Sequence, residues 1–354
     1  MKIAIDLTPL CGRKRTGVEM YAIDLYRALL STEHSIIPIF HVENELDTNP
    51  NAYIIKRTKR LWLENVALTR AICKIDADIT LFPIFPPPVD VYCRSKSKII
   101  PTLHDFTFLK YRKTLNYAAK YYLTPKYLLS FKKADAIITI SETIKNILKR
   151  YTIRPIYNCG ENISSDYKNC EKYADPAFLE RWGLKDSNYI ISVSTLEPRK
   201  NFKYLLKVIF PYLKRNNYKL VLVGRKGWGK DEELQTLIDD MQECLVFTEY
   251  VETECLISLY KYAFAFALLS VDEGFGRTPF EAVACGCKRV ILSDIEIFHE
   301  TFEENALFLP LNDVNKCTSL LLEQELPKIK ENFNIPFEVV EQRIKDLIQL
   351  YDNP

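Results

Sequence analysis

The chain has 354 residues, which is more than one ordinary domain core needs and enough for two domains of common size. Hydrophobic residues make up 47% of the chain and charged residues 27%, the balance of a globular protein. No apolar run reaches the roughly 18 to 20 residues of a membrane-spanning helix, and the first ten residues read as a strand, which excludes a signal peptide. We therefore expect a cytoplasmic protein.

The cysteine spacing excludes two further classes. None of the ten cysteines forms a CxxC pair, and the closest, Cys285 and Cys287, are separated by one residue. This spacing fits neither a zinc site nor a disulfide framework, so we expect reduced, mostly buried thiols. The net charge of +2 hides an asymmetry, because residues 1–166 contain 25 Lys and Arg against 16 Asp and Glu. The acidic remainder predicts two bodies with different partners.

The first predicted element is a strand from Met1 to Leu7. A loop that contains Gly12 and Gly17 follows, and a helical pattern runs from Val18 to Leu30. Strand, glycine-bearing loop and helix are typical of a doubly wound α/β unit. The glycine spacing is not GxGxxG, which weakens a nicotinamide-binding interpretation.

Five more strands are predicted in the first half, several of them separated by helix-like segments. They span Ile36 to Phe40, Ile79 to Phe82, Ile99 to Leu103, Ala136 to Ile140 and Arg154 to Tyr157. This alternation implies a parallel sheet, whose ligands bind beyond the carboxyl ends of the strands. His104 and Asp105 lie at such an end, although a lone histidine is more often structural than catalytic.

Asp76 and Asp78 form an Asp-x-Asp triplet, a pattern that also holds divalent cations in glycosyltransferases of the GT-A fold. Here the triplet precedes the strand and lies at its amino side. We interpret it as a solvated junction between a helix and a strand, with no metal.

The segment from Phe106 to Ala134 contains seven basic residues and no acidic one, interleaved with tyrosines. A solvated basic helix pair and a surface that rests on anionic lipid are equally good interpretations. Nucleic acid would also suit the charge, but no recognised nucleic-acid-binding module accompanies it, so we expect no nucleic-acid partner.

The polar, irregular stretch from Gly160 to Lys185 predicts a linker, and a second sheet is predicted to begin at Tyr189 to Ser194. Arg199 and Lys200 follow that strand and precede an amphipathic pattern from Phe202 to Leu213. Two cations at the carboxyl end of a strand have two interpretations. They lie at the start of a helix without a ligand, or they bind a diphosphate.

A second strand, glycine turn and helix lie between Leu268 and Val290. Gly274 and Gly276 flank Phe275 in the turn, so the backbone can approach a ligand closely and the next helix can offer its N–H groups to an anion. Glu273 and Glu281 bracket this turn. Because carboxylates repel phosphate, we expect these two to accept hydrogen bonds from sugar hydroxyls. A tight turn with two solvated glutamates is the plain alternative.

The chain therefore predicts two α/β domains and a terminal helix. The boundaries are 1–170 for the first domain, which we expect to bind the acceptor, 171–335 for the second, which we expect to bind the nucleotide sugar by the resemblance given below, and 336–354 for the final helix. The apolar stripe of that helix runs from Phe337 to Tyr351.

Several of these motifs resemble the retaining glycosyltransferase family 4, which has the GT-B fold. The carriers are Glu273-Gly-Phe-Gly276, Glu281-Ala282, Ala284 and Gly286, together with Glu197-Pro-Arg-Lys-Asn201 and His104-Asp105. Cys287-Lys288-Arg289 departs from the family, which often has a small residue followed by Pro-Val there. The resemblance implies two Rossmann-like doubly wound domains that face a cleft, with the final helix crossing back to the first domain.

The resemblance also implies residue roles. Arg199 and Lys200 would hold the donor diphosphate, Glu273 the donor sugar, Glu281 the ribose, and His104 would close the sugar pocket. The catalytic set is then His104, Arg199, Lys200 and Glu273, and the donor-binding set adds Gly12, Gly17, Gly274, Phe275, Gly276 and Glu281, with no metal and no cofactor beyond the nucleotide diphosphate sugar.

The implied activity is transfer of a sugar from GDP-mannose or a UDP-sugar to a saccharide acceptor with retention of configuration. The basic first half favours a lipid-linked acceptor at the inner face of the cytoplasmic membrane, as in synthesis of bacterial surface polysaccharide such as O-antigen. A nucleotide-sugar epimerase of the GT-B fold and a non-catalytic partner subunit that binds sugar nucleotides remain as alternatives.

Overall fold

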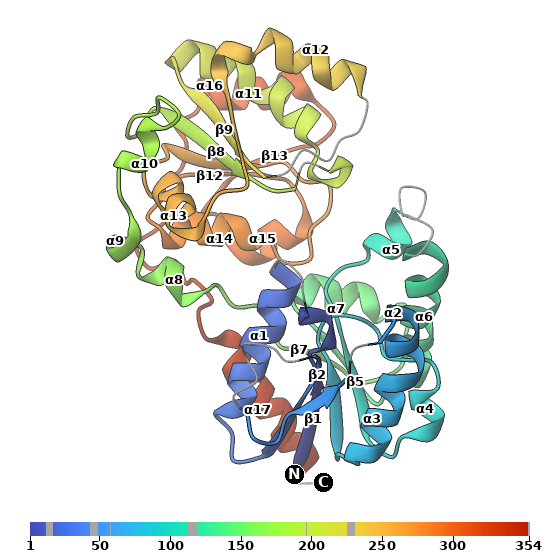
Figure 1. Ribbon diagram of the computed structural model, residues 1–354. Coiled ribbons are helices and arrows are strands. Elements are labelled where there is room, and N and C mark those ends of the chain that lie inside the picture. Colours follow the sequence, from blue (N-terminus) through green and yellow to red (C-terminus); the bar gives the residue numbers. More distant parts are fainter. Residues whose placement is uncertain are drawn as a thin grey trace. The chain divides into compact units, whose positions relative to one another are not determined.

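The structure is a computed structural model that describes residues 1–11, 17–42, 49–56, 58–111, 119–195, 197–224 and 231–352. The chain forms two compact units (Figure 1). Unit 1 contains Met1–Asn162 and Glu338–Pro354, and unit 2 contains Ile163–Phe337. The chain thus passes from unit 1 into unit 2 before the predicted boundary at residue 170, and it returns to unit 1 for its last helix, as predicted.

Unit 1 is built on a seven-stranded parallel sheet with the order β3-β2-β1-β4-β5-β6-β7. Its strands are β1 (Lys2–Asp6), β2 (Ser35–His41), β3 (Tyr53–Ile55), β4 (Ile79–Phe82), β5 (Lys98–Leu103), β6 (Ile137–Thr139) and β7 (Ile156–Asn158). Apart from Lys2 and Lys98 at their starts, the central strands β1, β4 and β5 are buried, because helices cover both faces of the sheet, as is usual for parallel sheets.

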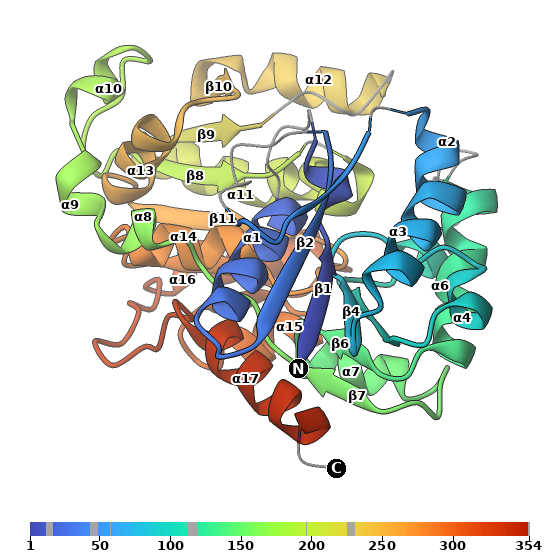
Figure 2. The same ribbon diagram turned by 60° about the horizontal axis from the view of Figure 1, so that its bottom comes forward.

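Helices from distant parts of the chain cover the unit 1 sheet (Figure 2). They are α1 (Gly17–Leu30), α2 (Arg60–Trp62), a π-helical turn (Leu63–Ala67), α3 (Leu68–Ile75), α4 (Val91–Arg94), α5 (Thr107–Lys110), a second π-helical turn (Ala119–Leu123), α6 (Thr124–Lys133), α7 (Glu142–Leu148) and α17 (Val339–Asp352), with a 3-10 turn at Thr8–Leu10.

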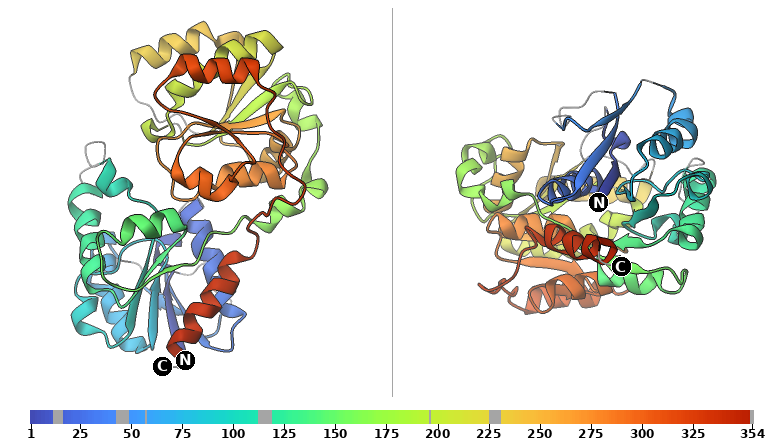
Figure 3. Two further views of the ribbon diagram at one scale, coloured as in Figure 1. Left: turned by 180° about the vertical axis from the view of Figure 1, so that it is seen from behind. Right: turned by 90° about the horizontal axis from the view of Figure 1, so that it is seen from below.

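Helix α17 lies beside α1 in unit 1 (Figure 3). Its Val340, Ile344, Leu347 and Ile348 are buried, which confirms the predicted apolar stripe. Asn162 Oδ1 accepts a hydrogen bond from the Val340 amide at 3.0 Å, and Ser31 Oγ of the segment after α1 donates to Glu341 Oε1 at 2.9 Å. These contacts attach the end of the chain to the first unit.

Unit 2 contains a six-stranded parallel sheet with the order β10-β9-β8-β11-β12-β13. Its strands are β8 (Tyr189–Val193), β9 (Lys219–Val223), β10 (Leu245–Glu249), β11 (Ala265–Leu268), β12 (Val290–Ser293) and β13 (Leu307–Leu309). The side chains alternate between two cores, because Ile191 and Val221 face one layer of helices and Ile190 and Leu220 face the other.

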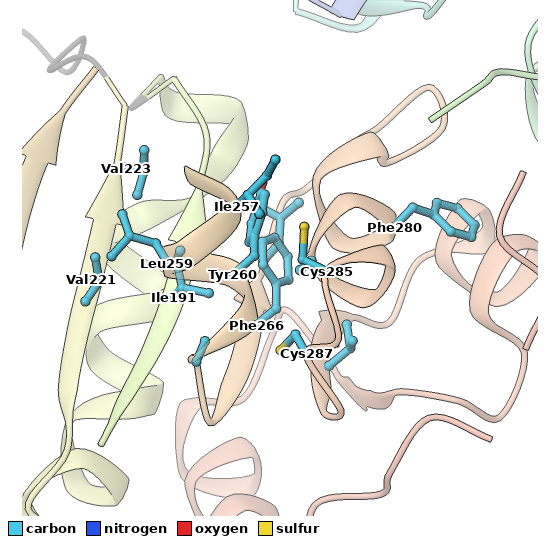
Figure 4. Packing of buried hydrophobic residues seen from close by; sticks show 14 of the residues in the cluster. Ile191, Val221, Val223, Ile257, Leu259, Tyr260, Phe266, Phe280, Cys285 and Cys287 are labelled. Carbon is cyan, nitrogen blue, oxygen red and sulfur yellow. The ribbon is translucent and has the colours of Figure 1, made fainter. Parts of the chain in front are cut away.

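The two helical layers of unit 2 are α11, α12 and α16 on one face, and α13, α14 and α15 on the other (Figure 1). The helices are α8 (Ser165–Lys168), α9 (Cys170–Tyr173), α10 (Ala177–Glu180), α11 (Phe202–Asn216), α12 (Glu232–Asp240), α13 (Thr253–Lys261), α14 (Arg277–Ala284), α15 (Glu296–Phe302) and α16 (Val314–Glu323), with 3-10 turns at Pro198–Lys200 and Gln242–Cys244. Figure 4 shows Tyr260 of α13 and Phe266 of β11 beside Cys285 in the core under α14.

The predicted linker is wrong for residues 163–185. This stretch carries α8, α9 and α10 and belongs to unit 2, where Ile163, Cys170, Leu179 and Leu184 are buried in the core. Each helix is a single turn, so few apolar side chains suffice to anchor the segment, and its overall composition remains polar.

Two smaller predictions are confirmed. Asp76 ends α3 in the left-handed conformation, and Asp78 Oδ2 accepts a hydrogen bond from the Lys2 amide at 2.7 Å, so the Asp-x-Asp triplet is an exposed helix-to-strand junction. All ten cysteines are free thiols, and six of them are buried.

Within the described ranges, no helix is both long and apolar enough to cross a membrane.

Candidate functional site

The predicted ligand residues of unit 2 gather where the strand order reverses. From β8 the chain moves outward through β9 and β10, and it then returns to add β11 on the other side of β8. In open parallel sheets the crevice at this switch point, beyond the carboxyl ends of the strands, is the usual ligand site. Arg199 and Lys200 follow β8, and Glu273 follows β11, so the topology brings the three residues together.

The two cations and Glu273 form one ion cluster. Lys200 Nζ donates to Glu273 Oε1 at 2.6 Å, and Arg199 Nη1 donates to Glu273 Oε2 at 3.2 Å. Arg199 also donates to the Asp272 carbonyl at 2.8 Å and to Glu197 Oε1 at 3.0 Å. The cations are therefore charge-balanced by carboxylates, and a bound diphosphate would share them with Glu273.

Neighbouring groups fix the charge and position of Glu273, whose exposed fraction is 8%. Burial alone raises the pKa of its carboxyl, but Lys200 and Arg199 outweigh burial, and the pKa lies below its ordinary value. Glu273 is thus ionised at neutral pH. Ser270 Oγ donates to Glu273 Oε1 at 2.7 Å, and the Ser270 carbonyl accepts from Ser293 Oγ of β12 at 2.6 Å.

The backbone joins the two loops directly, because the Val271 amide donates to the Arg199 carbonyl at 2.9 Å. The sequence prediction missed Ser270, although serine directly after a buried strand and before an acidic loop is a readable signal. Ser270 and the Val271 amide hold Glu273 and the two cations as one unit.

The glycine turn leads from this cluster into α14. Gly276 has a φ of 87°, and a Cβ at this position would lie 2.6 Å from Phe298 Cε1. Both the backbone conformation and the space therefore require glycine. Phe275 stacks on Phe280 with 5.3 Å between ring centroids, which turns this side chain toward the protein core. Because Pro279 lacks an N–H, the amide groups without an intrahelical acceptor at the start of α14 are those of Gly276, Arg277 and Thr278.

Glu281 occupies a separate position on α14. Its Oε2 accepts a hydrogen bond from Tyr260 Oη at 3.1 Å, and its Oε1 lies 3.7 Å from Arg277 Nε. Burial raises the pKa of Glu281, and Arg277 and Tyr260 oppose this effect only in part. The sequence prediction missed Arg277, even though the i,i+4 spacing to Glu281 is typical of an ion pair on a helix.

Among the predicted residues of unit 1, His104 lies at the carboxyl end of β5. Its Nε2 is 2.7 Å from the Pro83 carbonyl, to which it donates, and its ring contacts Tyr21 edge-on with 5.0 Å between centroids. Gly17 is the exposed first residue of α1, and Gly12 lies outside the described residues. The roles of these residues stay predictions. In the part of the chain that the structure describes, no three His, Cys, Asp or Glu side chains gather as ligands for a metal ion.

Two parallel-sheet Rossmann-like units, with a last helix that belongs to the first unit, define the GT-B class of α/β proteins. Residues 176–325 match the family described as Glycosyl transferases group 1. This segment includes the ion cluster, the glycine turn and Glu281. Residues 176–325 of the second unit therefore carry a group 1 glycosyltransferase domain.

Curated relatives agree with this family. The chain is 28% identical over 236 residues to the O-antigen chain mannosyltransferase RfbU of Salmonella typhimurium, an alignment that covers 66% of this chain and 63% of the relative. It is 30% identical over 200 residues to the O-antigen chain mannosyltransferase B of Escherichia coli, which covers 55% of this chain and 52% of the relative. The aligned regions thus span between half and two thirds of these proteins.

Solved structures share the fold over the whole chain. Sucrose-phosphate synthase from Thermosynechococcus elongatus superposes with a TM-score of 0.74 at 18% identity and covers 100% of both chains. Anabaena Alr3699/HepE in complex with UDP-glucose gives a TM-score of 0.70 at 15% identity, with 99% of this chain and 100% of that chain covered. At these identities the likeness establishes the GT-B fold.

Proposed function

We propose that this chain is a retaining, metal-independent glycosyltransferase that moves a hexosyl group from a nucleotide diphosphate sugar to a saccharide acceptor. The cluster of Arg199, Lys200 and Glu273 at the switch point of unit 2 is the observation that carries the proposal. It places two cations and a fixed carboxylate beside a helix start, in a unit that belongs to a glycosyltransferase family.

The chemical difficulty of the reaction is departure of the diphosphate. Arg199, Lys200 and the amide groups at the start of α14 would stabilise the negative charge that develops on it. Glu273 is ionised and oriented by Ser270, so it can accept hydrogen bonds from donor-sugar hydroxyls. Glu281 would hold the ribose, and His104, Gly12 and Gly17 keep their predicted roles in unit 1.

The relatives favour a mannosyl donor and a role in surface-polysaccharide synthesis of the O-antigen type, because both are O-antigen chain mannosyltransferases. A structural neighbour binds UDP-glucose, so uridine nucleotides belong in the same test. GDP-mannose and UDP-sugars are therefore the two donor classes to compare, and the acceptor is a growing saccharide, which we propose is lipid-linked.

The test is a thermal-shift screen against GDP, UDP and dTDP and their sugar conjugates. A nucleotide at 100 times its dissociation constant should stabilise unit 2 by about 2.7 kcal/mol. The variant Arg199→Ala/Lys200→Ala should lose this shift. Lys203→Ala/Lys207→Ala is the matched control, because it removes the same charge from partly exposed ion pairs with Asp231 and Glu233 outside the ion cluster.

Two readouts complete the test. NMR analysis of the glycosylated product should show the donor's anomeric configuration. A nucleotide shift that survives in Arg199→Ala/Lys200→Ala would contradict the diphosphate clamp, and isomerised donor without a glycosylated product would contradict the transferase assignment.

We also propose a peripheral membrane contact through the basic segment from Phe106 to Ala134. The structure reduces the set of residues that could face a membrane. Lys126 is buried, and Tyr127 stacks on Phe108 with 4.4 Å between ring centroids, so neither belongs to an exposed surface. Arg112, Lys113 and Tyr117 lie outside the described residues. Lys110, Lys132, Lys133 and Tyr121 are exposed. Lys132→Glu/Lys133→Glu should weaken sedimentation with anionic vesicles, and unchanged sedimentation would refute the contact.

A further inference from the structure

We propose that a polar cavity in unit 1 holds one hexopyranosyl residue of the saccharide acceptor, with Asp6 and Lys126 binding its hydroxyl groups. The inference rests on the proposed function and assigns a role to side chains that the donor site does not use.

The cavity occupies the switch point of the unit 1 sheet. β1 lies between β2 and β4, and the chain leaves β1 toward β2 and β3 before it returns to add β4 on the other side. Asp6 is the last residue of β1. It therefore holds in unit 1 the topological position that precedes Arg199 and Lys200 in unit 2, at the edge where open parallel sheets bind ligands.

The cavity has a volume of about 160 Å³. It lies between the carboxyl ends of β1 and β2, the loop after β4 and two helices that carry charged residues. Its lining comprises Asp6, Thr8, Pro9, Cys11, His41, Thr58, Arg60, Leu63, Glu64, Leu68, Phe85, Pro86, Pro88, Leu123 and Lys126.

Asp6 offers a free acceptor to this space. Its exposed fraction is 4%, and Oδ1 accepts hydrogen bonds from the amide of Thr8 at 3.1 Å and from Thr8 Oγ1 at 2.7 Å. Within the described ranges no donor reaches Oδ2. Burial raises the pKa of Asp6 to about 6, against the opposing effect of Thr8, so the ionised carboxylate at neutral pH lacks part of the solvation it needs. A ligand hydroxyl would supply the missing hydrogen bond.

Lys126 supplies donors in the same lining. It is buried, and its Nζ lies 2.7 Å from Tyr122 Oη and 3.5 Å from the Glu64 carbonyl. Burial lowers the pKa of its ammonium to about 8, although Glu64 opposes this effect. Glu64 is itself paired with Arg60 at 2.5 Å. The wall thus holds both signs of charge in fixed positions.

The local helix geometry supports a ligand site. The helix from Arg60 to Ile75 contains the π-helical turn Leu63–Ala67, and the helix from Ala119 to Lys133 contains the π-helical turn Ala119–Leu123. π-Helical turns are rare and concentrate at functional sites. The first carries Leu63 and Glu64 into the cavity lining, and the second carries Leu123.

The chemistry of the lining selects an uncharged polyol over an anion. Asp6 and Glu64 balance the charges of Arg60 and Lys126, so the lining has no surplus of positive charge to hold a phosphate. A sugar hydroxyl, in contrast, can donate to Asp6 and accept from Lys126 at the same time. Phe85 and the prolines Pro86 and Pro88 add an apolar wall, against which the C–H face of a pyranose ring can pack. This mixture of two acids, two bases and an aromatic ring contrasts with the site of unit 2, where two cations face one buried carboxylate.

The experiment uses the full chain and saturation-transfer difference NMR with four probes, the methyl α-glycosides of mannose, glucose, galactose and N-acetylglucosamine. At least one should bind wild-type protein at millimolar concentration, and Asp6→Asn and Lys126→Met should each weaken that binding at least tenfold. Asp78→Asn is the matched control, because it makes the same change at the amino edge of the same sheet and should leave binding unaltered.

Thermal shifts with GDP and UDP on the same samples separate this inference from the donor site. The shifts should be equal in wild type, Asp6→Asn and Lys126→Met, since Asp6 and Lys126 do not belong to the donor cluster, the ion cluster of Arg199, Lys200 and Glu273. Failure of all four glycosides to bind wild type, or equal binding by Asp6→Asn, would overturn the acceptor cavity while a nucleotide shift would still support the transferase. Glycoside binding without any nucleotide shift would leave the cavity standing and count against the proposed donor site.

Discussion

Glu273 and Asp6 are both buried carboxylates beyond the carboxyl ends of parallel strands, but their neighbours give them opposite energetics. Two cations within 3.2 Å stabilise the ionised form of Glu273. Asp6 has only the amide and hydroxyl of Thr8 on one oxygen, and burial dominates. Ionised Glu273 therefore contributes to the stability of unit 2, whereas ionised Asp6 costs stability in unit 1.

This difference makes the effect of Asp6→Asn depend on pH. The pKa of Asp6 is about 6 in the folded protein and 3.8 in its ordinary range, so the folded state binds this proton more tightly than the unfolded chain. The contribution of Asp6 to stability therefore falls as pH rises from about 4 to about 6 and stays low above that. Asp6→Asn should raise the free energy of unfolding at pH 8 by about 1 to 3 kcal/mol and change it little at pH 4.

Urea denaturation at the two pH values measures this effect. The charged groups that face Asp6 in the same cavity are Lys126, Glu64, Arg60 and His41. Asp6→Asn removes the attraction between the Asp6 carboxylate and Lys126, and this loss sets the lower end of the expected gain in unfolding free energy. Destabilisation at pH 8 would mean that Asp6 is already fully satisfied within the fold.

Gly276 and Gly286 provide a second residue-level prediction. Both have positive φ, 87° and 95°, but a Cβ at Gly276 would collide with Phe298, whereas nothing lies within 4 Å of a Cβ at Gly286. Gly276→Ala should cost about 2 to 4 kcal/mol, with backbone strain and overpacking combined, and Gly286→Ala only about 1 kcal/mol. Thermal denaturation compares the two, and Gly276→Ala should also weaken nucleotide binding. Equal losses would show that the Phe298 ring moves aside freely.

Sequence patterns identified the residues of the donor cluster because motif and strand end coincide there. Arg199, Lys200 and Glu273 each follow an apolar run, and a parallel sheet brings such ends to one edge. Asp6 also follows a strand, but Lys126 lies 120 residues further along in a basic segment that reads as solvated surface. Charge alone cannot distinguish a buried lysine from an exposed one, so the cavity of unit 1 became visible only in the structure.

At the level of elements, most strands of the unit 1 sheet could be predicted, whereas the edge strands β3 and β13 could not. β4 coincides with its predicted range, Ile79 to Phe82, because three of its four residues are apolar. β3 and β13 have three residues each at the outer positions of their sheets and carry too little pattern to be recognised. Helices α8, α9 and α10 could not be predicted for the same reason, since a single helical turn is too short to show a helical period in the sequence.

Helix α17 gives a prediction about packing. Helix α17 packs on α1, and its Ile344 is fully buried, whereas its Leu350 is 58% exposed. Ile344→Ala should lower the free energy of unfolding of unit 1 by about 2 to 5 kcal/mol, and Leu350→Ala by less than about 0.5 kcal/mol. Chemical denaturation followed by circular dichroism measures both. A small loss in Ile344→Ala would mean that α17 detaches without affecting the unit 1 core.

For the whole molecule, separate cores imply separate responses to ligands. Each unit has its own sheet and its own hydrophobic clusters, and the donor cluster lies entirely in unit 2. Hydrogen exchange measured by mass spectrometry should therefore show protection by GDP or UDP at the segments after β8 and β11. The strands of unit 1 should show no protection by the nucleotide alone. Protection of β1 or β4 by nucleotide would contradict the assignment of that ligand to unit 2.

The return of α17 to unit 1 also sets the order in which the two units can be completed during synthesis. All of unit 2 lies in one continuous stretch, 163–337, whereas unit 1 needs residues 338–352 to cover α1. A nascent chain emerges from the ribosome in sequence order, and domains fold as units once their residues are available. The unit that is made first is thus finished second, and until then the apolar side of α1 stays uncovered and is a natural target for chaperones.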